Sequence, residues 1–214
     1  MPPTPLPPPT SIGFGATCLR AACYILLIAA MMEGVHYEAL YLKGTRFSEY
    51  GFTELAEIIF LTVISALLLY VRHVQKALPT VTLLMFAFVF SSLIREQDHF
   101  LDRYVFDGAW QTLVTLVLVP CLTLVIMRRR RFVAEFVHYS NTFSFGLFAA
   151  GFLTTYVFSR LYGRSEMWIA IFEDDYRRTF KDAAEEVTEL LGYSLILIAV
   201  IEMVLLVRRW RAQT

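Results

Sequence analysis

Four ionisable residues follow one another at helical spacing near the middle of the chain. Arg95, Asp98, His99 and Asp102 fall at positions i, i+3, i+4 and i+7, so a continuous helix would present all four on one face. An acid, a base and an imidazole on one face could move protons. We therefore predict Asp98 and His99 as catalytic candidates, and Arg95 and Asp102 as binding residues. A structural network of ion pairs is the alternative interpretation.

Acidic residues also mark the starts of two apolar segments. Glu54 and Glu57 are three residues apart at the start of one segment, and Glu185 and Glu189 are four apart at the start of the last. The helix dipole alone would favour Glu54 and Glu57 there, and solvation is the simpler explanation of Glu185. All three are retained as binding candidates. Glu189 lies deeper in its segment, so we predict it as a third catalytic candidate.

Histidine placement limits the metal chemistry that this chain could perform. Glu33 and His36 are three residues apart and share a helix face. His36 and His99 are the two histidines expected on the acidic side of the membrane, so a three-histidine zinc site is excluded within one chain. A divalent metal ion could still bind through histidines and carboxylates, and Glu33, His36 and His99 are the candidate ligands.

Apolar segments supply the elements that must hold these residues. The 214 residues are 57% hydrophobic and 18% charged, against roughly 45–50% and 25% in soluble domains. A membrane-spanning helix needs about 20 mostly apolar residues. Six such segments lie at about 19–42, 52–71, 79–101, 109–127, 132–161 and 183–207. Between the last two, segment 167–182 carries aromatic and charged residues on opposite helical faces, which is typical of a helix in the membrane interface.

The predicted fold is therefore all-α. It is an integral membrane bundle of six transmembrane helices, with an interfacial amphipathic helix before the last. The first ten residues, MPPTPLPPPT, contain too many prolines for a helix or a strand. We predict a disordered, proline-rich tail over residues 1–17 and a six-helix transmembrane domain over residues 18–210, with no room for a second soluble domain.

The charges divide unequally between the two sides of this bundle. Both termini share one side with basic residues in short turns and in the C-terminal tail: Arg20, Arg72, Lys76, Arg128, Arg129, Arg130, Arg131, Arg208, Arg209 and Arg211. The positive-inside rule places this side, and both termini, in the cytoplasm. Of the 19 acidic residues, only Glu135 and Glu202 are expected on that side. The remaining acids lie at the outer leaflet or outside the membrane.

Two short segments carry a resemblance to other proteins. The sequence REQDH at 95–99 and the sequence EEVTELLGY at 185–193 are similar to segments of uncharacterised multi-pass membrane proteins of bacteria. The resemblance implies a location in the bacterial cytoplasmic (inner) membrane. It implies no particular activity.

Binding at the outer leaflet is the function that these features favour. A polar cluster of Glu, Asp, His and Arg side chains there would bind a cation, a lipid headgroup or a partner protein, which includes a second copy of the chain. The alternative is a membrane-embedded, metal-dependent enzyme acting on a lipid of the outer leaflet. A third interpretation is a structural subunit. The formal net charge is zero, which argues against a nucleic-acid partner.

Overall fold

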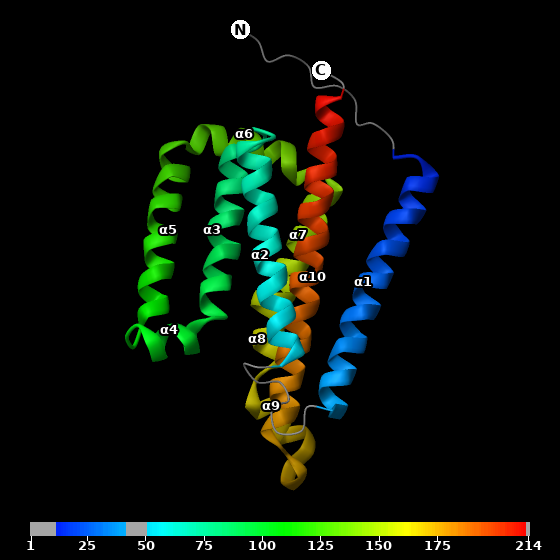
Figure 1. Cartoon of the computed structure of the whole chain (residues 1–214), viewed down its shortest axis with the longest axis vertical. Coiled ribbons are helices and arrows are strands. Elements are labelled where there is room, and N and C mark those ends of the chain that lie inside the picture. The colour runs from blue at the N-terminus through cyan, green and yellow to red at the C-terminus, as the bar shows by residue number, and fades with distance from the viewer. Residues whose placement is uncertain (1–11, 42–50, 213–214) are drawn as a thin grey trace.

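The computed structural model describes residues 12–41 and 51–212, and every regular element in these two ranges is a helix. Figure 1 shows long helices standing side by side, with α6 at one end of the bundle and α4 and α9 at the other. The predicted all-α bundle is confirmed. Most of the proline-rich tail lies outside the described residues, and the first helix begins at Phe14.

Two kinds of element are long and apolar enough to cross a membrane. Four are single helices: α1 (Phe14–Tyr41), α2 (Phe52–His73), α5 (Ala109–Met127) and α10 (Arg178–Arg211). Two are bent pairs: α3 (Pro79–Arg95) meets α4 (Asp98–Tyr104) at 61°, and α6 (Arg129–Ser140) meets the stretch from Phe143 to Tyr162 at 98°. By length and composition, the described residues therefore contain four candidate spans, or six if each bent pair is counted as one.

The predicted fifth span is interrupted by the sharper of these bends. Thr142 starts a new helix, because its Oγ1 accepts a hydrogen bond from the backbone N–H of Phe145 at 3.2 Å and so caps α7 (Phe143–Leu153). The chain continues through the π-helical turn η1 (Thr154–Phe158) into α8 (Ser159–Tyr162). The predicted span thus consists of two helical stretches, α6 and the stretch from Phe143 to Tyr162, which meet at 98°.

The predicted interfacial helix is also divided. It consists of α9 (Ser165–Phe172), which is followed by the short 3₁₀ turn η2 (Glu173–Asp175), and α10 already begins at Arg178. Phe172 connects the two parts, since its ring stacks on Trp168 at 5.9 Å and on Phe180 of α10 at 4.5 Å between ring centroids. These aromatic contacts hold α9 against the start of the last span.

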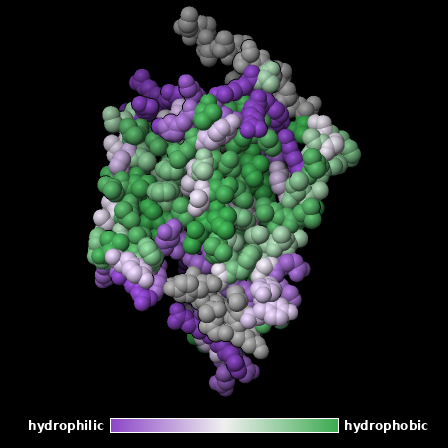
Figure 2. Space-filling model, viewed as in Figure 1, coloured by the Kyte–Doolittle hydropathy of each residue, from purple (hydrophilic) through white to green (hydrophobic). Residues whose placement is uncertain are grey.

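The core lies where α2, α3, α7 and α10 pack together. Its fully buried side chains include Leu61, Ile64 and Leu68 of α2 and Val200 and Met203 of α10. By contrast, α1 and α5 bury few residues and expose mostly apolar side chains, as helices facing lipid do. Figure 2 shows a broad hydrophobic band between two hydrophilic ends. These features fit an integral membrane protein.

We call the end that contains residues 128–131 and 208–211 the basic end, and the opposite end, where α2 and α10 begin, the acidic end. Both acids at the basic end have partners. Glu202 of α10 accepts hydrogen bonds from Arg20 at 2.8 Å and from Tyr24, both on α1. Glu135 of α6 accepts from the backbone N–H of Thr80 at 2.8 Å, at the start of α3. These two acids therefore connect α1 with α10 and α6 with the start of α3.

Candidate functional site

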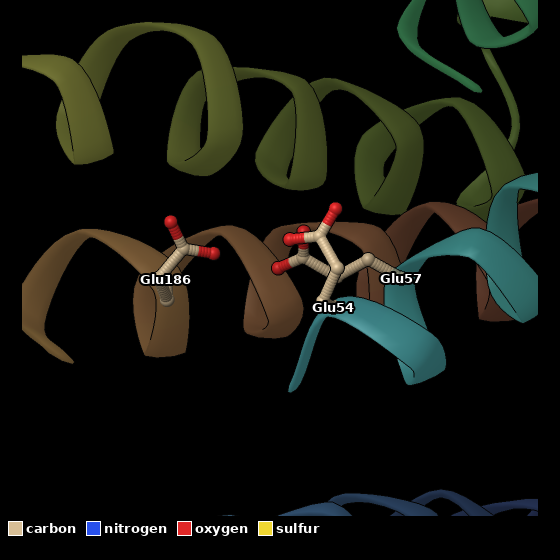
Figure 3. A group of neighbouring side chains, drawn as sticks. All are labelled: Glu54, Glu57 and Glu186. Carbon is tan, nitrogen blue, oxygen red and sulfur yellow. The ribbon is translucent and has the colours of Figure 1, made fainter. Parts of the chain in front are cut away.

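Five glutamates from three parts of the chain meet at the acidic end. Two lie at the start of α2, one directly follows α3, and two lie in the early turns of α10: Glu54, Glu57, Glu96, Glu186 and Glu189. One group consists of Glu54, Glu57 and Glu186, and the other of Glu57, Glu96 and Glu189. Within each group, one carboxylate oxygen from every member lies within 4.8 Å of the others. Glu57 belongs to both groups, and Figure 3 shows the first of them.

Helical spacing on two packed helices explains this convergence. Glu54 and Glu57 are three residues apart on α2, and Glu186 and Glu189 are three apart on α10, so each pair occupies one helix face. Because α2 packs against α10, the two faces meet. Glu96 joins them from the bend between α3 and α4. The site is therefore assembled by tertiary packing, and no single segment contains it.

Glu57 is the most unusual member of the site. Its side chain has no solvent exposure, and neither of its carboxylate oxygens has a hydrogen-bond partner among the described residues. A buried carboxylate without a partner carries a large desolvation cost, and neighbouring carboxylates add repulsion to it. Glu186 likewise has no ion-pair partner within residues 12–41 and 51–212. A positive ion between these oxygens would offset both costs.

The second group is already compensated by arginine. Arg95 contacts Glu96 at 2.7 Å and Glu189 at 3.1 Å through its Nη2 atom. Arg160 of α8 contacts Glu189 at 2.8 Å and Glu185 at 2.6 Å. Guanidinium groups therefore occupy the side of the site around Glu189. In the first group, Glu57 and Glu186 have no ion-pair partner among the described residues, and they lie between α2 and the early part of α10.

The π-helical turn η1 places the residues that reach Glu189 from α8. Ser159 directly follows this turn, is fully buried, and lies with its Oγ 3.3 Å from Glu189 Oε1. Arg160 is the next residue and makes the ion pairs described above. π-Helical turns insert one extra residue into a helix and often occur at functional sites. Here the turn sets the rotation of α8 relative to α10.

A row of hydroxyl groups leads from the site toward the middle of the bundle. The buried Tyr193 donates a hydrogen bond to Glu96 Oε1 at 3.0 Å. Its ring lies edge-on to Tyr156 at 6.5 Å between centroids, and the hydroxyl of Tyr156 is 2.5 Å from Ser92 Oγ. These contacts hold Glu96 from the apolar side of the site.

The structure brings five of the sequence-predicted residues to this site. Glu54, Glu57 and Glu189 are members of the carboxylate groups, and Arg95 and Glu185 are their neighbours through ion pairs. Their convergence does not follow from spacing alone, because it depends on α2, α3, α8 and α10 meeting at one depth.

The remaining residues of the predicted stripe lie on α4, beyond the 61° bend, and not on α3. Asp98 and His99 are exposed on α4, and the Asp102 carboxylate accepts a hydrogen bond from the backbone N–H of Gly108 at 3.0 Å. Arg95 and Asp98 thus lie on different helices, because the helix that would have aligned them ends at Arg95. His99 still lines a cavity that adjoins Glu54 and Glu96.

The candidate metal ligands Glu33 and His36 do not belong to the carboxylate groups of this site. Both are exposed on α1, and neither is a member of the two carboxylate groups found among the described residues. Nearby on the same helix, Glu38 is buried and accepts hydrogen bonds from the backbone N–H and the hydroxyl of Thr53, at 2.9 and 2.7 Å. The acid of α1 that contacts the bundle here is thus Glu38.

Four residues of the site were not among the predicted site residues. Glu96 was not predicted because it does not lie on the helix face of the predicted stripe. The bend after Arg95 turns it toward α10. Arg160 and Ser159 had no nearby partner in sequence, since their contacts are with residues 185 and 189. Glu186 was not predicted either, although it lies three residues before Glu189. A count of acids against bases near the start of α10 would have drawn attention to it.

Comparison with known protein families, with curated proteins and with solved structures yields no match for this chain.

Proposed function

We propose that this integral membrane protein binds a divalent cation at its acidic end, between Glu54 and Glu57 of α2 and Glu186 of α10. The observation that carries the proposal is Glu57, whose two oxygens are buried without a partner in the described residues and lie beside two other carboxylates. A bound cation would supply the missing positive charge. Arg95 and Arg160 already serve that purpose for the neighbouring Glu189.

The spacing of the oxygens supports a single ion. Calcium accepts oxygen ligands at about 2.3–2.6 Å, so two ligands on opposite sides of one ion are separated by about 5 Å. One oxygen from each of the three glutamates lies within 4.8 Å of the others, which is compatible with one coordination sphere. Carboxylates favour hard cations such as Ca²⁺, Mg²⁺ and Mn²⁺ over metals that prefer sulfur or imidazole ligands.

The proposal includes the orientation of the protein in its membrane. The basic end carries arginines in a short turn and in the C-terminal segment, and the positive-inside rule puts such an end in the cytoplasm. The carboxylate groups would then lie at the outer leaflet of a cytoplasmic membrane. A cation from outside the cell could reach the site there.

A binding experiment on the full chain tests this function. The protein is purified in detergent, stripped with a chelator, and titrated with Ca²⁺, Mg²⁺ and Mn²⁺ by isothermal calorimetry, with Mn²⁺ followed in parallel by electron paramagnetic resonance. We expect about one saturable ion per chain. We also expect Glu57→Gln to weaken binding at least about tenfold, or by about 1.4 kcal/mol.

The matched control is Glu33→Gln, which makes the same chemical change at an exposed acid on α1. It should leave the affinity unchanged. Without added cation, Glu57→Gln should fold at least as well as the original protein, because it removes a buried charge that has no partner. A protein that binds none of the three ions up to millimolar concentration, or a Glu57→Gln variant with undiminished affinity, would rule out the proposed function.

A further inference from the structure

An apolar cavity of about 200 Å³ lies between α3, α6 and α7, and it begins beside α6 at the basic end. On α7 its lining residues are Phe145, Phe148 and Phe152, whose spacing of three and four residues puts them on one helix face. The lining residues of α3 repeat in the same way from Val81 to Phe88. Stripes on two helices therefore form the walls, and the cavity is a groove that runs along these helices.

Aromatic contacts mark the two ends of this groove. Near α6, the Phe145 ring lies edge-on to Phe136 of α6, at 5.5 Å between centroids. At the inner end, Phe88 of α3 and Phe152 of α7 meet with their centroids 5.1 Å apart. Phe88 follows the start of α3 at Pro79 by about nine residues, or about 13 Å along a helix. The groove thus extends from the basic end toward the middle of the bundle, as the acyl chain of a lipid does.

The groove is open at the surface of the molecule, because the rings that line it are incompletely covered. Phe145 and Phe148 are half-buried, and Phe136 is 40% exposed. The Tyr139 hydroxyl, which is the polar group of the lining, bonds to Ser144 Oγ at 3.0 Å. Pockets that enclose a drug-sized molecule measure about 300–1,000 Å³. A smaller groove with this lining suits a single hydrocarbon chain.

Arginines lie at the α6 end of the groove. The helix begins at Arg129, and the lining residues Phe132 and Phe136 follow it at i+3 and i+7, so Arg129 shares their helix face. Arg128 and Arg130 flank it in sequence. All three arginines are exposed, and none has an ion-pair partner in the part of the chain that the structure describes.

The acid of α6 does not neutralise these arginines, because it is already bound elsewhere. Glu135 pairs with Arg131 at 2.7 Å and accepts a hydrogen bond from the backbone N–H of Thr80 at 2.8 Å. The other acid of the basic end, Glu202, is bound by Arg20 of α1. Positive charge without a counter-charge among the described residues therefore adjoins an apolar groove.

We propose that this groove binds an anionic phospholipid, with one acyl chain between α3 and α7 and the phosphate against Arg129. Arginine binds phosphate through paired N–H groups, and basic residues beside membrane helices attract anionic headgroups. Because α6 meets the stretch from Phe143 to Tyr162 at 98°, it turns from the direction of the acyl chains into the plane of the headgroups. The site is at the opposite end from the proposed cation site, so the two proposals are independent.

Native mass spectrometry of the full chain in detergent tests the site. Delipidated protein is titrated with phosphatidylglycerol, with phosphatidylcholine of the same acyl chains, and with glycerol phosphate, which carries the charge without the chains. We expect one phosphatidylglycerol per chain, bound at least about tenfold more tightly than either of the others. Equal affinity for the two lipids would overturn the role of the arginines, and equally tight glycerol phosphate would overturn the role of the groove.

A pair of arginine variants separates a defined site from diffuse attraction. Arg129→Gln should weaken binding of phosphatidylglycerol about tenfold, because hydrogen bonds to a charged group are lost, and should leave phosphatidylcholine binding unchanged. Arg130→Gln is the matched control, since it removes the same charge one residue later, on a different face of α6. It should have a clearly smaller effect. Equal losses in the two variants would mean that the basic run attracts anionic lipid without a defined site.

A second pair of variants tests the groove itself. Phe136→Ala removes a lining ring and should weaken binding of both lipids by about fivefold, because apolar contact with the chain is lost. Val133→Ala, at an exposed position of α6 outside the groove, should change neither affinity. Melting temperatures measured without added lipid show that each variant is folded. Undiminished lipid affinity in folded Phe136→Ala would contradict the placement of the acyl chain.

Discussion

Gly192 of α10 lies directly against Thr155 in the π-helical turn η1. A Cβ atom at position 192 would stand 1.9 Å from Thr155 Oγ1 and 2.9 Å from the backbone nitrogen of the same residue. Thr155 is fully buried, so it has no space to withdraw. This close approach of two backbones sets the distance between α10 and α8, and hence the contacts of Ser159 and Arg160 with Glu189.

Gly192→Ala should therefore destabilise the protein and disturb the site. Overpacking of this kind costs about 1–3 kcal/mol, and a domain of this size loses roughly 2–4 °C of melting temperature per kcal/mol. We expect a lower melting temperature in detergent together with weaker cation binding. Gly146→Ala is the control, because a Cβ there meets no atom within 4 Å, and it should be neutral or slightly stabilising. Equal melting temperatures for the two variants would contradict this account of the helix contact.

Arg160→Gln should tighten cation binding. Its guanidinium neutralises Glu185 and Glu189 beside the proposed ion, and its removal makes the site more negative. Arg160 is 41% exposed, so solvent screens the effect and we expect only about a two- to fivefold increase in affinity. The increase should shrink as salt is added. Arg164→Gln removes the same charge at an exposed position four residues later and provides the control. A weaker cation affinity in Arg160→Gln would contradict the prediction and show that Arg160 supports the structure of the site.

Glu202→Gln should loosen α1 from the bundle. This helix buries only Val35 and Glu38 among its own residues, so its attachment at the basic end depends on the contacts of Arg20 and Tyr24 with Glu202. Loss of hydrogen bonds to a charged group costs about 1.5–3 kcal/mol. Hydrogen–deuterium exchange should become faster throughout α1 and remain unchanged in α5. Exchange that is unchanged in α1 would mean that apolar contacts alone hold the helix.

Glu135→Gln should weaken the start of α3. The carboxylate accepts hydrogen bonds from the backbone N–H groups of Thr80 and Val81, at 2.8 and 3.2 Å, and from the Thr80 hydroxyl at 2.6 Å. An amide keeps part of this cap but loses the negative charge that suits a helix N-terminus, which is worth about 0.3–1 kcal/mol and up to about 2 kcal/mol when partly buried. The melting temperature should fall by a few degrees, while cation binding at the opposite end should not change. A change in cation affinity would indicate coupling between the two ends.

Several features of this protein could be predicted from local sequence because their causes are local. The length and apolar composition of each segment determine whether it crosses a membrane, so the boundaries of α2 and α5 were close to those predicted. The separation of basic and acidic ends follows from the same alternation of segments and turns. Likewise, Glu54 and Glu57 share a face because a helix repeats every 3.6 residues.

Only the tertiary structure decided which of these groups meet. The bend after Arg95 separates that residue from Asp98 and turns Glu96 inward, whereas an unbroken 3.6-residue repeat had predicted one stripe. The partners of Glu189 are 94 residues away at Arg95 and 30 residues away at Ser159, so their meeting depends on how α3 and α8 pack against α10. Periodicity describes one helix at a time. The rotation and depth of neighbouring helices are set by close contacts such as Gly192 with Thr155, which leave no mark on the spacing of charges along the chain.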